Sequence, residues 1–239
     1  MWFRPKCPVS AEEKDWIERR MGWLCEQFGR DRMRQSPVIL PTVEFFPDPY
    51  HSTEADARLL MERVCGYMGI DPGRVSLGFY SEEEPDLGEG FRMEGHREGT
   101  AGLHRGGERP EIWIESSRLD DPVALVATLA HELGHVHLLD DGRISRDEED
   151  HEPLTDLLTV YFGLGVITAN AYLREKRQQG LRYSSWSLSR QGYLLAPAYG
   201  YALSLFAWGR GESNPAWARE LRPDVRQPFQ RGLRYLQKI

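Results

Sequence analysis

The chain has 239 residues, of which 40% are hydrophobic, and a formal net charge of −7. It is long enough to bury one sizeable core, or one core with a smaller lobe. The acidic balance argues against nucleic acid as a partner of the whole chain. This balance is uneven, because residues 1–156 hold 33 acidic and 18 basic residues (−15) and residues 157–239 hold 4 and 12 (+8). We expect two oppositely charged lobes that pack together, with an acidic partner for the C-terminal stretch as the alternative.

Cysteine usage and hydropathy bear on the cellular compartment. Cys7, Cys25 and Cys65 are widely spaced and match no metal or redox motif. The first residues lack the continuous apolar run of a signal peptide, so we expect a reducing, cytoplasmic location. The uncharged runs 157–173 and 194–208 are shorter than the roughly 20 residues that cross a bilayer. They predict buried helices and no membrane span.

The N-terminal part of the chain predicts two helices. Ser10 and Glu13 have the spacing of a capping box, which opens a helix that reaches about Met33. Residues 38–46 could form a short strand, although three prolines restrict it to a sheet edge or a loop. A second helix is predicted from residue 53 or 54 to residue 68.

Three strands follow. Residues 75–80 alternate as a strand, residues 81–97 are rich in glycine and acid and predict a loop, and residues 99–104 form a weaker strand pattern. Residues 111–115 form a better strand, and the two glycines before them predict a turn. The last two strands therefore predict a hairpin.

The next segment carries the pattern H-E-x-x-H at His131, Glu132 and His135. Asp121 at an N-cap and Pro122 at the first helical position precede a nearly continuous apolar run, which is typical of a buried helix. Two histidines four apart differ by about 40° around a helix, so both imidazoles can reach one tetrahedral cation. Glu132 is turned by about 100°, where it could take a proton from a metal-bound water. The alternative is two core histidines that bind backbone carbonyls.

His137 lies about 200° around the helix from His135 and cannot share its metal. We interpret it as a structural or surface histidine.

A third ligand is expected downstream, because catalytic zinc usually takes three protein ligands and keeps a fourth position for water. Glu152 and Pro153 predict the start of a helix that runs to about residue 173. Glu152 and Asp156 are four apart on one face of that helix. Several other residues compete with Glu152 for the metal: Glu148, Glu149, Asp150, His151 and Asp156.

H-E-x-x-H followed by E-x-x-x-D on the next helix resembles the gluzincin metallopeptidases over roughly residues 112–171. Residues 152–165 are also similar to bacterial proteins of unknown function that carry both motifs. The resemblance implies a bound Zn²⁺, with Glu132 as general base and Asp156 orienting one ligand histidine. The implied zinc ligands are His131, His135 and Glu152.

The resemblance also implies a fold. It is the zincin-like α+β fold, in which a small, partly antiparallel sheet packs on the motif helix and a mainly helical lobe follows. We expect one catalytic domain over residues 1–239, with lobes 1–140 and 141–239. In such folds an edge strand pairs with extended substrate, and residues 112–114 or 99–104 are the candidates here.

The C-terminal part predicts two more helices, at residues 189–208 with an interruption near Pro197 and at residues 223–238. Peptide hydrolysis often uses a tyrosine, histidine or arginine to stabilise the oxyanion. Tyr193 and Tyr199 are candidates from their order in the chain, or else core aromatics. Tyr161 is a poor candidate, because it lies about 180° from Glu152 on the same helix.

The predicted function is a zinc-dependent hydrolase of peptide or amide bonds, with a peptide or protein substrate. The alternative is a regulatory or sensor protein of zincin fold, in which the metal is structural and no proteolysis occurs. A helical interaction protein without metal would require the order of the two motifs to be accidental.

Overall fold

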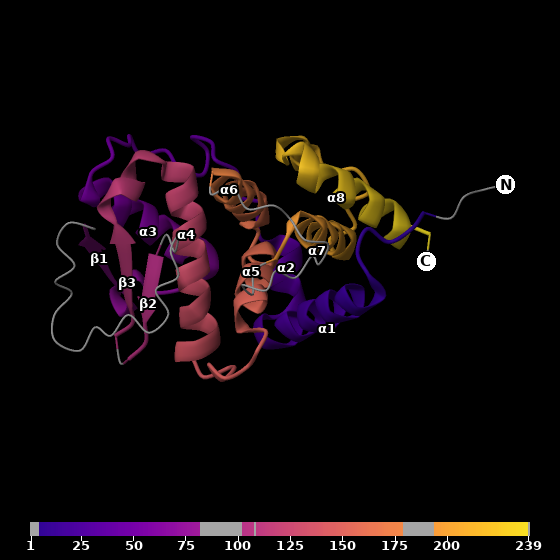
Figure 1. Ribbon diagram of the computed structural model, residues 1–239, viewed down its shortest axis with the longest axis horizontal. Coiled ribbons are helices and arrows are strands. Elements are labelled where there is room, and N and C mark those ends of the chain that lie inside the picture. The colour runs from indigo at the N-terminus through magenta and orange to yellow at the C-terminus, as the bar shows by residue number, and fades with distance from the viewer. Residues whose placement is uncertain (1–4, 82–101, 108, 179–193, 239) are drawn as a thin grey trace. The chain divides into compact units, whose positions relative to one another are not determined.

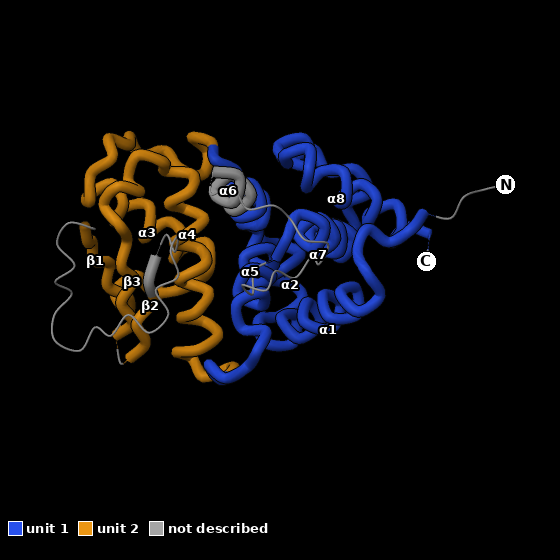
Figure 2. Tube along the Cα trace, viewed as in Figure 1, with its two compact units in different colours: residues 1–41, 145–239 blue, residues 42–144 orange. Residues whose placement is uncertain are grey.

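The computed structural model describes residues 5–81, 102–107, 109–178 and 194–238. The fold is mixed, with a small three-stranded sheet and many helices, as the α+β prediction requires (Figure 1). The chain divides into two compact units, residues 42–144 and residues 1–41 with 145–239 (Figure 2). Residues 1–41 therefore group with the C-terminal half, whereas the predicted lobe boundary at residue 140 places them with the sheet. The single catalytic domain stays a prediction.

The unit of residues 42–144 contains the sheet, in the order β1-β3-β2. β1 (Ser76–Tyr80) runs parallel to β3 (Glu111–Glu115), and β2 (Gly102–Arg105) runs antiparallel to β3. The predicted hairpin is thus confirmed. β3 is the central strand, so the prediction of residues 112–114 as an edge strand is wrong. β2 lies at an edge of this sheet.

The two faces of β3 differ because its side chains alternate. Ile112 and Ile114 are fully buried, and the residues between and beside them are only partly covered. On the other face the Trp113 indole lies over Gly78 of the neighbouring strand, where a Cβ atom would collide with the ring. Helices cover the sheet: α3 (Glu54–Met68) contacts β1, α4 (Pro122–His135) contacts β2, and the two helices contact each other.

Short helical turns complete this unit: η1 (Pro72–Arg74), η2 (Ser116–Asp120) and η3 (Val136–Asp140). α3 follows the sequence prediction closely. Thr53 caps it through a capping box with Asp56, and Gly69 ends it in the left-handed conformation.

The second unit is helical. Its closest helix pair is α7 with α8, and small residues allow the approach, because Cβ atoms at Gly200 and Gly232 would meet the facing helix. The helix predicted at residues 223–238 is confirmed as α8, which buries Val225 and Phe229. The helices of this unit are α1 (Ala11–Phe28), α2 (Arg30–Gln35), α5 (His151–Tyr161), α6 (Gly165–Gln178), α7 (Ala196–Gly209), η4 (Ala216–Glu220) and α8 (Pro223–Leu236). In the part of the chain that the structure describes, no helix is long and apolar enough to cross a membrane.

Three predicted elements are corrected. The first helix breaks at Gly29, whose φ of 95° does not continue a helix. Residues 38–46 form turns and no strand, and the buried Ile39 donates its N–H to the Gly163 carbonyl at 2.9 Å. The helix of the second motif ends at Tyr161 and not near residue 173, because Gly163 turns the chain with a φ of 84° before α6. Residues 82–97 and 189–193 of the predicted loop and helix lie outside the described residues.

Gly163 offers a direct test of this break. We expect Gly163→Ala to lower the free energy of unfolding by about 1–3 kcal/mol, because its positive φ is unfavourable for alanine. A Cβ atom there would also collide with the Pro37 carbonyl oxygen. Urea denaturation would measure the loss. Gly22→Ala is the control, since nothing lies within 4 Å of that Cβ position and alanine favours the helix by up to about 1 kcal/mol. Equal effects of the two substitutions would contradict the assignment.

Candidate metal centre

The helix that carries H-E-x-x-H begins and packs as its sequence predicts. The Asp121 carboxylate accepts the N–H of Ala124 at 3.1 Å, and Pro122 occupies the first helical position. Every residue of the helix is buried or half-buried. Its buried apolar residues are Leu125, Val126, Leu129, Ala130 and Leu133. The motif therefore lies at the C-terminal end of a buried helix.

The two motif histidines share one face of α4. Their ring centroids are 4.9 Å apart and the rings are nearly perpendicular, at 87°. His131 is half-buried and His135 is 7% exposed. Glu132 is also buried, with 6% exposed. An imidazole pair in this position can supply two nitrogen ligands, and Glu132 provides a carboxylate beside them.

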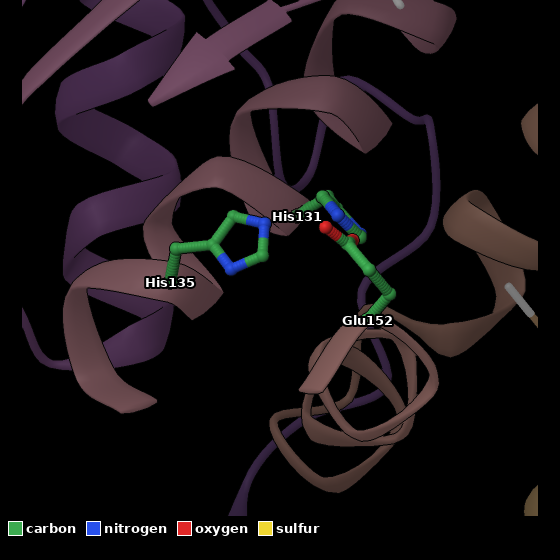
Figure 3. Close-up of side chains that lie close together, drawn as sticks. All are labelled: His131, His135 and Glu152. Atoms are coloured by element: carbon green, nitrogen blue, oxygen red, sulfur yellow. The ribbon is translucent and has the colours of Figure 1, made fainter. Parts of the chain in front are cut away.

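Glu152 completes a group of three possible metal ligands. One possible ligand atom from each of His131, His135 and Glu152 lies within 4.8 Å of the others, and the three side chains point toward one another (Figure 3). Ligands of a tetrahedral zinc ion lie about 3.4 Å apart at bond lengths near 2.1 Å. Small side-chain rotations would therefore bring the three atoms to a common ion. Two nitrogens and one carboxylate oxygen form a donor set that suits zinc.

Asp150, a competing ligand, is held by α1 instead. Its carboxylate accepts the indole N–H of Trp16 at 2.7 Å and two N–H groups of Arg20 at 2.6 and 2.7 Å. Burial acts to raise the pKa of Asp150, but these hydrogen bonds outweigh it and hold the pKa below its ordinary value. Arg20 also donates to Glu148 at 2.7 Å. Two of the competing carboxylates thus have other partners immediately before Glu152.

The remaining neighbours of Glu152 take different positions. His151 lies with Nδ1 2.8 Å from the Glu148 carbonyl oxygen and with Nε2 3.3 Å from Glu152 Oε1. Asp156 is 4% exposed, and its Oδ2 accepts the backbone N–H of Leu194 at 2.9 Å. This bond fixes the chain just before α7. The predicted role of Asp156 in orienting a ligand histidine stays a prediction.

His137 has the structural role, one of the two roles predicted for it. It is 7% exposed, its Nε2 lies 3.0 Å from the Met68 carbonyl oxygen, and its Nδ1 lies 3.4 Å from Asp141. Burial is the main cause that lowers the pKa of His137. Its bond to Met68 joins the turn after α4 to the end of α3.

The sequence analysis missed one histidine near the motif. His104 on β2 lies with its ring centroid 5.5 Å from that of His135, and its Nε2 is 2.6 Å from Asp140 Oδ2. No spacing in the sequence relates a residue of this strand to the helix. The only signal was the strand pattern itself. In the structure β2 is the antiparallel edge strand and contacts α4.

Two tyrosines were predicted as oxyanion donors, and the structure describes one of them. Tyr199 lies on α7 with 1% exposed, and Tyr193 lies outside the described residues. Tyr161 is fully buried and donates its hydroxyl to the Gly29 carbonyl at 2.5 Å. The identity of the oxyanion donor stays a prediction.

Comparison of the chain with protein-family models, curated proteins and solved structures gives no significant match. The resemblance to gluzincins therefore rests on the two motifs alone.

Removal of Glu152 tests the three-ligand group. We expect the purified protein to bind about one zinc per chain and Glu152→Ala to lose or greatly weaken this binding, because two histidines alone leave a weaker site. Elemental mass spectrometry after dialysis would measure the content. Glu149→Ala removes an exposed neighbouring carboxylate and should leave the content unchanged. Full zinc retention in Glu152→Ala would assign the third ligand to another residue.

Removal of Arg20 tests the contacts that precede α5. We expect Arg20→Gln to lower the free energy of unfolding by about 1–2 kcal/mol, since it loses charged hydrogen bonds to Asp150 and Glu148 at a partly exposed site. Thermal and urea denaturation would measure this loss. The neighbouring Arg19 is exposed, so Arg19→Gln should change stability by no more than about 0.5 kcal/mol. An equally small effect of Arg20→Gln would show that these bonds contribute little.

Proposed function

We propose that this protein is a zinc-dependent hydrolase of peptide or amide bonds, with the metal held by His131, His135 and Glu152. The observation that carries the proposal is the convergence of one possible ligand atom from each residue to within 4.8 Å. Catalytic zinc sites commonly have such a set of three protein ligands and leave a fourth position for water. The same donors also accept iron, cobalt, nickel or manganese, so geometry and availability select the metal.

The proposed chemistry depends on Glu132. Bound zinc would polarise the scissile carbonyl and lower the pKa of a bound water toward 7. Glu132 follows His131 directly and is turned by about 100° around α4, so its carboxylate would not readily join the two ligand nitrogens and could instead lean over the open position of the metal. There it would accept the proton of the attacking water and transfer it to the nitrogen of the leaving amine.

We further infer a zincin-like fold and a peptide or protein substrate. Support for the fold comes from β2, an antiparallel edge strand that contacts the motif helix. An extended peptide could add to such an edge through main-chain hydrogen bonds. The cytoplasmic location predicted from the cysteines is part of the same proposal.

Substitution of the general base separates metal binding from hydrolysis. We expect Glu132→Gln to keep one zinc per chain and to lower peptide hydrolysis at least about 100-fold, because the amide cannot accept the proton. Cleavage of a diverse library of unstructured peptides, read by mass spectrometry, would supply a measurable reaction whatever the sequence preference of the enzyme. Glu149→Gln is the matched control and should keep both properties.

The outcomes distinguish the candidate functions. Hydrolysis retained in Glu132→Gln would reject the role of Glu132. Zinc binding without hydrolysis by the unmodified protein, over the whole library, would favour the sensor or regulatory alternative with a structural metal.

A further inference from the structure

His104 and Asp140 form a buried pair that the proposed chemistry does not use. Their side chains are 4% and 8% exposed, and His104 Nε2 lies 2.6 Å from Asp140 Oδ2. Burying two ionisable side chains removes them from water at a cost in free energy. A protein with apolar residues of similar volume in their place is often equally stable. The location of such a pair therefore calls for a reason other than stability.

The turn that follows the motif helix explains how Asp140 reaches His104. Asp140 is five residues after His135, and in an α-helix that spacing leaves two side chains about 140° apart. Residues Val136–Asp140 form a π-turn instead, in which the N–H of Asp141 bonds to the carbonyl of Val136 at 3.0 Å. Hydrogen bonds between residues five apart widen the turn. Asp140 is thereby turned back toward the side of the helix that carries His135.

His104 contacts the last residue of this turn and the residue just before it. Its nitrogen bonds to Asp140, and its ring lies 5.5 Å from the His135 ring at an interplanar angle of 35°. The His135 ring also meets His131, nearly at a right angle. A ring with two such neighbours has little freedom to rotate, so the directions of its two nitrogens are restricted.

We propose that the His104–Asp140 pair positions His135 for metal binding. Asp140 holds the His104 ring by a hydrogen bond, and that ring in turn holds the plane of His135. The pair is a positioning device and supplies no metal ligand. This inference rests on the proposed binding of metal by His131, His135 and Glu152, but it does not depend on hydrolysis.

Two substitutions test the hydrogen bond while each leaves a ring beside His135. Asp140→Asn keeps the size of the side chain and removes its charge, and His104→Phe keeps a ring beside His135 and removes the bond. The control is His137→Gln, which removes a different buried histidine of the same π-turn, one directed to Met68. Circular dichroism and thermal denaturation would establish that each variant is folded.

The measurement is made with metal alone. The metal-free protein is titrated with Co²⁺, whose visible absorption reports coordination geometry, and zinc affinity is measured by competition with a chromophoric chelator. We expect Asp140→Asn and His104→Phe to bind one metal with about 10- to 100-fold weaker affinity and with altered Co²⁺ bands. His137→Gln should keep the bands and the affinity of the unmodified protein.

Two results would overturn the positioning role while the proposed metal site stands. One is unchanged bands and affinity in both variants, and the other is an equal change in His137→Gln, which would indicate general loosening of the turn. Failure of the unmodified protein to bind metal would instead reject the proposed function and this inference together. If His104→Phe does not fold, the conservative Asp140→Asn decides the question.

Discussion

Ionisable groups at the end of a helix packed in apolar side chains need partners, because an uncompensated charge in a low-dielectric interior costs several kcal/mol. α4 is such a helix, and His131, Glu132 and His135 are its last polar residues. None of the three is fully exposed. The burial of α4 is therefore the constraint to which the neighbouring polar side chains respond, and a bound cation would compensate two imidazoles and a carboxylate at once.

The segment before α5 meets a related constraint. It carries several carboxylates in a row. These repel one another unless cations or hydrogen-bond donors bind them. Arg20 and Trp16 bind Asp150, and Arg20 also binds Glu148. Side chains of α1 therefore bind two of the carboxylates that precede Glu152. The start of α5 is thus connected to a helix more than a hundred residues earlier in the chain. Such a connection gives Glu152 a defined position in its unit.

The π-turn after α4 redirects the side chains that follow the motif. His137 binds the end of α3 and Asp140 binds His104 on β2. Both bonds lie within the unit of residues 42–144, so they join the motif helix to the sheet and to α3. π-turns are frequent at functional sites, since they place side chains where regular helical geometry does not. The turn here connects a possible ligand histidine to a buried partner.

Local rules explain what the sequence by itself determined. Capping residues and helical spacing predicted α3, α4 and the paired histidines, and strand alternation predicted β1 and β3, because these properties depend on neighbours a few residues apart. The angle of His137 around the helix predicted that it shares no metal with His135, and its burial then decided between a structural and a surface role. Only the tertiary structure showed that possible ligand atoms of Glu152, His131 and His135 lie within 4.8 Å of one another, and that Asp150 is held by α1. It also decided that β3 is central, that Gly163 ends α5 against Pro37, and that His104 lies beside His135. These features depend on packing between distant segments, which local periodicity does not encode.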